Sequence, residues 1–94
     1  MLEVYRFQFD HVVSEQIIEE QITEAVLAVE SIYGKAKVRL ETSLIVSKNR
    51  AVIEGSTEVG QRLAQVFTGF MTHKVGENRF TVEHLKNKNI KDAT

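Results

Sequence analysis

The chain lacks several residue types whose absence restricts its chemistry. It contains no cysteine, which excludes disulfide bonds, thiolate metal sites and cysteine nucleophiles. It contains no proline, so glycine, asparagine, aspartate and serine must make its turns. Its apolar runs are shorter than the roughly 20 residues of a membrane-spanning helix, and the first ten residues, MLEVYRFQFD, do not resemble a signal peptide. We therefore expect a cytoplasmic protein.

The charge is nearly balanced, with 12 Lys and Arg residues against 13 Asp and Glu residues. A nucleic-acid-binding protein usually has a positive excess or a basic face, so this balance argues against such a partner. The length of 94 residues and the hydrophobic fraction of 43% are typical of one globular domain. We expect that domain to span residues 1–85. Residues 86–94, KNKNIKDAT, have no periodicity and are expected to form a flexible C-terminal tail.

Four segments have the period-two alternation of β-strands, namely residues 3–9, 35–47, 50–56 and 79–85. In the first, Tyr5, Phe7 and Phe9 share one face. The second segment, KAKVRLETSLIVS, alternates over its whole length, with Val38 and Leu40 on its apolar face and Arg39 on its polar face. Lys48 and Asn49 are expected at the tip of a hairpin between the second and third strands.

Two segments have the apolar spacing of amphipathic helices. The first begins after Ser14, a good N-cap residue, and ends before Gly34. The second begins after Ser56 or Thr57 and ends before Gly76. Gly60 and Gly69 lie inside this second helix, where each costs about 1 kcal/mol relative to alanine.

The order strand, helix, strand, strand, helix, strand predicts an α+β fold. We expect a ferredoxin-like βαββαβ two-layer sandwich, in which a four-stranded antiparallel sheet carries both helices on one face. Right-handed crossovers place the first and third strands side by side in the centre. Tyr5, Phe7 and Phe9 then pack against the helices. We also expect the first and third strands to run in the same direction, which brings both helix N-termini to one edge of the sheet.

That expectation groups five polar residues into a candidate ligand site. Helix N-termini attract anions, and a histidine can exchange a proton near neutral pH. The candidate residues are Asp10, His11, Ser14, Ser56 and Thr57. The alternative is that they only cap helices and shape turns, because Asp, Ser and Thr are the usual capping residues.

The sequence offers no stronger signal of catalysis, of a metal or of a cofactor. His11, His73 and His84 have no metal-ligand spacing, and no nucleophile motif is present. RNA-binding modules of similar architecture stack bases on aromatic residues of the first and third strands. The predicted third strand, RAVIEGS, has none. We therefore assign no catalytic residue, no metal and no cofactor, and we do not expect nucleic acid or a membrane as partners.

The sheet face away from the helices is the more informative surface. It combines apolar side chains with charges of both signs, and such a surface can match a symmetric copy of itself. We expect assembly into a homodimer or a higher homo-oligomer through this face, chiefly Val4, Arg6, Arg39 and Val52, or through a strand edge. The predicted function is that of a small cytoplasmic, non-enzymatic module that acts through self-association and through protein or ligand contact. The alternative function is a small-molecule or anion-binding protein, or an enzyme, with its pocket at the helix N-termini.

Overall fold

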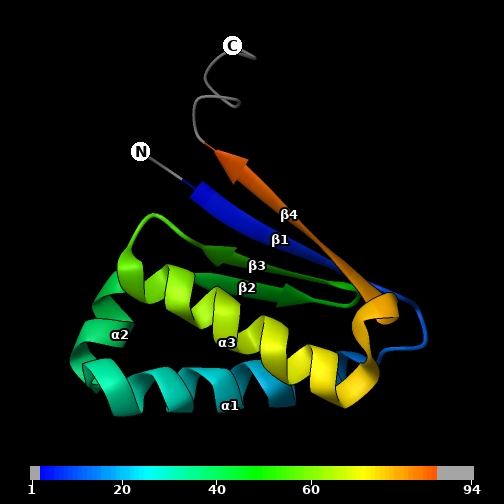
Figure 1. Ribbon diagram of the computed structural model, residues 1–94, viewed down its shortest axis with the longest axis horizontal. Coiled ribbons are helices and arrows are strands. Elements are labelled where there is room, and N and C mark those ends of the chain that lie inside the picture. The colour runs from blue at the N-terminus through cyan, green and yellow to red at the C-terminus, as the bar shows by residue number, and fades with distance from the viewer. Residues whose placement is uncertain (1–2, 87–94) are drawn as a thin grey trace.

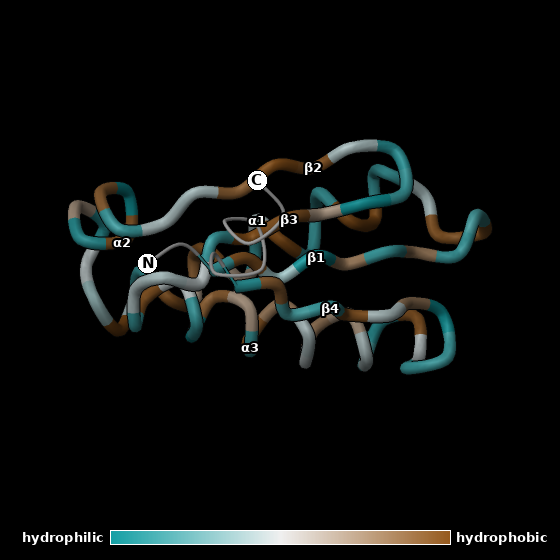
Figure 2. The backbone as a smooth tube through the Cα atoms, turned by 90° about the horizontal axis from the view of Figure 1, so that it is seen from above, coloured by the Kyte–Doolittle hydropathy of each residue, from teal (hydrophilic) through white to brown (hydrophobic). Residues whose placement is uncertain are grey.

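The computed structural model describes residues 3–86 and has an α+β architecture with one four-stranded antiparallel sheet and three α-helices (Figure 1). The strands are β1 (Glu3–Phe9), β2 (Leu44–Ser47), β3 (Arg50–Glu54) and β4 (Phe80–Lys86). They lie side by side in the order β2-β3-β1-β4, which is also visible from above in Figure 2. The first and third strands are central, as the sequence predicts.

The direction of the central strands differs from the expectation. β1 and β3 are antiparallel, with Val4 opposite Glu54 and Gln8 opposite Arg50. The reason lies in the hairpin at Lys48 and Asn49, which reverses the chain between β2 and β3. The connection through α1 makes β2 run in the direction of β1, so β3 must run against it. The predicted parallel pair was wrong, and the two helix N-termini therefore lie at opposite ends of the sheet.

The first long helix, α1 (Glu15–Tyr33), has the ends that the sequence predicts. The Ser14 side chain accepts a hydrogen bond from the amide of Ile17, as an N-cap residue does. Val13 is buried before the helix, where a hydrophobic residue stabilises the entry of the chain. Gly34 follows the helix with φ of 90°, a conformation that other residues rarely adopt.

The second long helix, α3 (Glu58–Val75), is also bounded as expected. The Thr57 hydroxyl accepts a hydrogen bond from the Gly60 amide, and Gly76 ends the helix with φ of 95°. A one-turn 3-10 helix, η1 (Glu77–Arg79), then leads directly into β4. Gly60 packs so closely against the backbone of β3 that a side chain there would overlap the Glu54 carbonyl oxygen.

The third helix, α2 (Lys35–Glu41), corrects the sequence interpretation, which placed residues 35–47 in one long strand. Only residues 44–47 of that segment are extended. Lys, Ala, Arg, Leu and Glu in this stretch are good helix formers, and Lys37 and Glu41 form an i, i+4 ion pair of 3.4 Å. Val38 is buried, whereas Leu40 is 85% exposed, so the two do not share a strand face.

The hydrophobic core lies between one face of the sheet and the two long helices. Phe7 and Phe9 of β1 are buried there, and Tyr5 packs at the margin of the core, as predicted. The Phe7 ring meets Phe67 of α3 edge to face, with ring centroids 4.9 Å apart. Because α1 and α3 both pack on this face, neither covers the opposite face of the sheet, which we call the open face.

The end of the domain lies slightly further along the chain than the sequence predicts. Lys86 is the last residue of β4, whereas the sequence analysis places it in the C-terminal tail of residues 86–94. Residues 87–94 lie outside the described part of the chain. None of the helices within residues 3–86 has the apolar length that a membrane crossing requires.

Candidate functional site

The five polar residues of the predicted ligand site do not form one group. Asp10, His11 and Ser14 follow the C-terminal end of β1. Ser56 lies at the other end of that strand, where its hydroxyl accepts a hydrogen bond of 2.9 Å from the Glu3 amide. A seven-residue strand spans about 20 Å. We expected Asp10, His11 and Ser14 to lie close to Ser56 and Thr57. That expectation was wrong, because β1 and β3 are antiparallel and the two groups lie at opposite ends of the sheet.

Asp10 organises the turn between β1 and α1. Its Oδ1 accepts a hydrogen bond of 3.1 Å from the Val12 amide, and its Oδ2 lies 3.3 Å from Nη1 of Arg79. His11 Nδ1 is 3.1 Å from Oδ1. The Val12 hydrogen bond, followed by the bond from Arg79 and the charges of His11 and Arg79, lowers the pKa of Asp10 below its ordinary value of 3.8, although partial burial opposes the shift. The carboxylate therefore holds the turn and the start of β4 together.

The other four residues have equally local contacts. The His11 side chain is 89% exposed, Ser14 caps α1, and Ser56 contacts the start of β1. Thr57 caps α3 and also donates a hydrogen bond of 2.7 Å to the Glu41 carbonyl at the end of α2. In the described part of the chain, His, Asp and Glu side chains do not gather in groups of three that could ligate a metal.

The open face of the sheet is the larger candidate surface. On this face β1 presents Val4, Arg6 and Gln8, because Phe7 and Phe9 point to the helices. The register brings Val52 beside Arg6 and Ile45 beside Val52. Three of the four predicted interface residues, Val4, Arg6 and Val52, thus share one surface. Arg39 does not, because it lies in α2, and its assignment to the sheet was wrong.

Four aliphatic side chains form a staggered band across this face. Ile45 of β2 is opposite Val52 of β3, and Val4 of β1 is opposite Leu85 of β4. Val52 and Val4 are diagonal neighbours, because Val52 is opposite Arg6 and Val4 is opposite Glu54. We call these residues the aliphatic band (Ile45, Val52, Val4 and Leu85). Ile45 is 67% exposed and the other three are partly exposed.

Charges of both signs flank the aliphatic band. Arg6 Nη2 lies 2.6 Å from Oε1 of Glu83, which is opposite Arg6 in the register. Arg50 donates a hydrogen bond of 3.3 Å to the Gln8 side chain, and Glu54 adds a second carboxylate. Two arginines are thus matched by two glutamates. Leu85 and Arg50 were not among the predicted interface residues. The signal for Leu85 was the period-two alternation of β4, which places it on the same face as Thr81 and Glu83.

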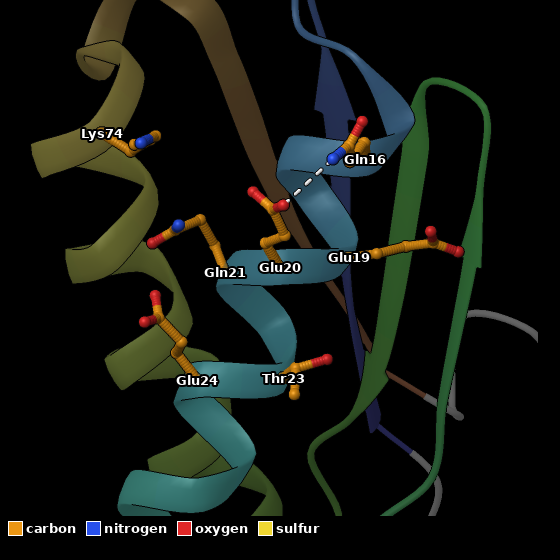
Figure 3. Close-up of a pocket in the computed structure, with 7 residues that line it drawn as sticks. All are labelled: Gln16, Glu19, Glu20, Gln21, Thr23, Glu24 and Lys74. Carbon is orange, nitrogen blue, oxygen red and sulfur yellow. Dashed lines mark hydrogen bonds between the residues drawn. The ribbon is translucent and has the colours of Figure 1, made fainter.

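A second candidate surface lies between α1 and α3, on the side away from the sheet. In Figure 3, Glu20, Gln21 and Glu24 of α1 point toward α3, and Lys74 of α3 points back toward them. Gln16 donates a hydrogen bond of 3.2 Å to Glu20. Further along, Leu27, 59% exposed, and Phe70 line a groove of about 580 Å³.

Comparison with known proteins adds no relative to this description. No protein-family model, no curated protein and no solved structure matches the chain.

Proposed function

We propose that this chain is a small, non-enzymatic, self-associating module whose working surface is the open face of the sheet. The observation that carries the proposal is the aliphatic band, which crosses all four strands on a face that neither α1 nor α3 covers. An antiparallel sheet with one solvated face usually presents mainly polar residues there. A contiguous aliphatic patch bounded by polar residues instead marks an interaction surface.

The charges around the aliphatic band favour a second copy of the chain as the partner. Arg6 and Arg50 match Glu54 and Glu83 in number, so the face has no net charge to attract a strongly acidic or basic partner. In a two-fold symmetric dimer, the open face of one chain packs against the same face of the second chain. A face with paired charges of both signs is compatible with that arrangement, because each cation has a carboxylate available on the other copy.

The polar residues at the helix ends support a module more than a ligand-binding protein. Ser14 and Thr57 accept capping hydrogen bonds, and Ser56 accepts one from the Glu3 amide of β1. The Asp10 carboxylate accepts hydrogen bonds from Val12 and Arg79. These local contacts support the alternative in which the residues cap helices and shape turns.

The order of the helices and strands also supports a more specific fold. We propose a ferredoxin-like arrangement in which α2 is an addition to the connection between α1 and β2. The order of the other elements and the central position of β1 and β3 support it. A cytoplasmic location is the setting that we propose for a chain without cysteine.

The test is the molecular mass in solution, measured by light scattering and sedimentation from low to high micromolar concentration. We expect the wild-type chain to exceed the monomer mass. Ile45→Asp and Val52→Asp place a carboxylate in the aliphatic band and should weaken the association at least about tenfold, because an aliphatic side chain contributes about 1.5–3 kcal/mol when it is buried.

Arg39→Glu is the matched control, because it changes the charge of an exposed residue on α2, away from the sheet face. It should leave the mass unchanged. A wild-type chain that remains monomeric at high micromolar concentration would falsify the proposal. A loss of association in Arg39→Glu with none in Ile45→Asp would move the interface to α2 and would also contradict it.

A further inference from the structure

The outer edge of β4 is the longest unpaired strand edge in the described chain. β4 pairs with β1 over seven residues, from Glu3 opposite Lys86 to Phe9 opposite Phe80. On its other side, no strand within residues 3–86 pairs with it (Figure 1). The opposite edge of the sheet, β2, has four residues. A long, regular edge presents backbone groups that can pair with another strand.

The hydrogen-bond pattern shows which backbone groups of β4 point outward. The Asp10 amide donates to the Arg79 carbonyl, so the register makes Asp10 and Arg79 a hydrogen-bonded pair. Such pairs alternate along an antiparallel ladder. The backbone of Thr81, Glu83 and Leu85 therefore faces β1. The outward-facing N–H and C=O groups belong to Phe80, Val82, His84 and Lys86.

β4 has few of the features that normally protect an edge strand. The chain has no proline, and the pairing with β1 continues without a bulge. Two of its polar side chains lean back toward β1. Glu83 is held by Arg6 at 2.6 Å. His84 lies 3.0 Å from Glu3 and stacks on the Tyr5 ring at a centroid distance of 4.6 Å. The Glu83 carboxylate and the His84 ring are thus drawn away from the outer edge.

Val82 gives the same edge an apolar centre. It is opposite Phe7 and therefore lies on the helix face of the sheet. Phe7 is fully buried, whereas Val82 is 41% exposed. The helices therefore cover the central strand and leave the middle of β4 accessible.

We propose that β4 pairs antiparallel with β4 of a second copy, about a two-fold axis at Val82. In this register Val82 faces its own copy, Thr81 faces Glu83, and Phe80 faces His84. The outward backbone groups of Phe80, Val82 and His84 then meet one another. A register centred on Glu83 would place two carboxylates directly opposite, which is destabilising.

This inference goes beyond the proposed function, because it adds an interface that does not use the aliphatic band. Edge pairing joins two four-stranded sheets into one continuous sheet with every long helix on the same side. The open faces of both copies then form one surface. Association through that surface as well, about a two-fold axis that meets the first at a right angle, gives a tetramer with three perpendicular two-fold axes.

Single cysteines test the register, because the chain has none of its own. Across a hydrogen-bonded pair the Cα atoms are about 5.5 Å apart, which a disulfide can bridge. We expect Val82→Cys to form a disulfide-linked dimer under mild oxidation. Glu83→Cys is the matched control. In the proposed register its two copies are diagonal, about 8 Å apart, which is beyond disulfide reach. Crosslinking of Glu83→Cys alone, or of neither variant, would overturn the proposal.

Light scattering gives an independent readout. If both interfaces form, the wild-type chain has four times the monomer mass, and Val82→Lys, which opposes two ammonium groups, reduces it to twice that mass. Val12→Lys is the control, because Val12 is 59% exposed and lies outside the strands. Circular dichroism verifies that each variant is folded. If the mass of Val82→Lys equals that of the wild type, the edge interface is wrong even where Ile45→Asp shows that the face interface is right.

Discussion

Gly60 and Gly69 lie in the same helix, but their surroundings are opposite. A Cβ atom at Gly60 would overlap the Glu54 carbonyl oxygen, whereas a Cβ atom at Gly69 would meet nothing within 4 Å. Gly60 therefore allows α3 to start close against the end of β3. Gly69 has no such contact and only weakens the helix.

Alanine at these two positions should change stability in opposite directions. We expect Gly69→Ala to raise the free energy of unfolding by about 0.5–1 kcal/mol, because alanine loses less backbone entropy in a helix. Gly60→Ala should lower it by about 1–3 kcal/mol, as overpacking does. Urea denaturation measures both, and each variant is the control for the other. Equal effects would contradict the close approach of α3 to β3.

At the same scale, the Asp10 carboxylate should make stability depend on pH. Its pKa is lower in the folded chain than its ordinary value of 3.8, so folding favours the ionised form. The contribution is therefore fully present above that value and is lost as the pH falls through the lowered pKa. The difference in unfolding free energy between the wild type and Asp10→Asn should be largest near neutral pH.

Urea denaturation between about pH 7 and pH 2.5 tests this prediction. Glu19→Gln, on the exposed side of α1, is the control for the loss of one negative charge. If the Asp10→Asn difference is the same at both ends of this range, the hydrogen bonds from Val12 and Arg79 do not stabilise the ionised carboxylate.

Among the elements, α2 gives the clearest test of the structure. A strand over residues 35–47 would put Val38 and Leu40 on the same buried face, whereas the helix buries Val38 and leaves Leu40 85% exposed. We expect Val38→Ala to lower the free energy of unfolding by about 2 kcal/mol, because it leaves a cavity in the core. Leu40→Ala should change it by less than about 0.5 kcal/mol. Comparable losses in both variants would favour the strand.

Elements whose ends depend on local chemistry could be predicted from the sequence. Ser14 and Thr57 as caps, and Gly34 and Gly76 as stops, mark α1 and α3 because each effect acts within one helical turn. The apolar face of β1 was likewise evident from Tyr5, Phe7 and Phe9.

Two features, the conformation of residues 35–41 and the grouping of the candidate ligand residues, depend on tertiary structure and not on local chemistry. The segment at residues 35–41 satisfies both a period of two and helix propensity, and the two differ in tertiary packing, because only the helix buries Val38 while leaving Leu40 exposed. The candidate ligand site depended on the relative direction of β1 and β3. That direction follows from the element order, because the crossover keeps the strand direction and the hairpin at Lys48 and Asn49 reverses it, so the predicted hairpin already implied an antiparallel pair.

At the scale of the whole molecule, α1 and α3 cover one face of the sheet, and the outer edge of β4 has no partner strand within residues 3–86. The aliphatic band and the β4 edge are separate surfaces, so their effects on mass should combine. We expect the double variant Ile45→Asp, Val82→Lys to be monomeric where each single variant is dimeric. Sedimentation at matched concentrations measures this. A double variant that remains dimeric would point to a third surface, such as the groove between α1 and α3.

The two roles of the Thr57 hydroxyl have a consequence for local motion. The group accepts from the first turn of α3 and donates to the last residue of α2, so neither end can fray without releasing the other. Amide protons of α2 should therefore exchange with deuterium together with those of the first turn of α3, as one cooperative unit. A seven-residue helix, too short to persist alone in water, thus takes its lifetime from a helix whose N-cap residue lies sixteen residues beyond its own last residue.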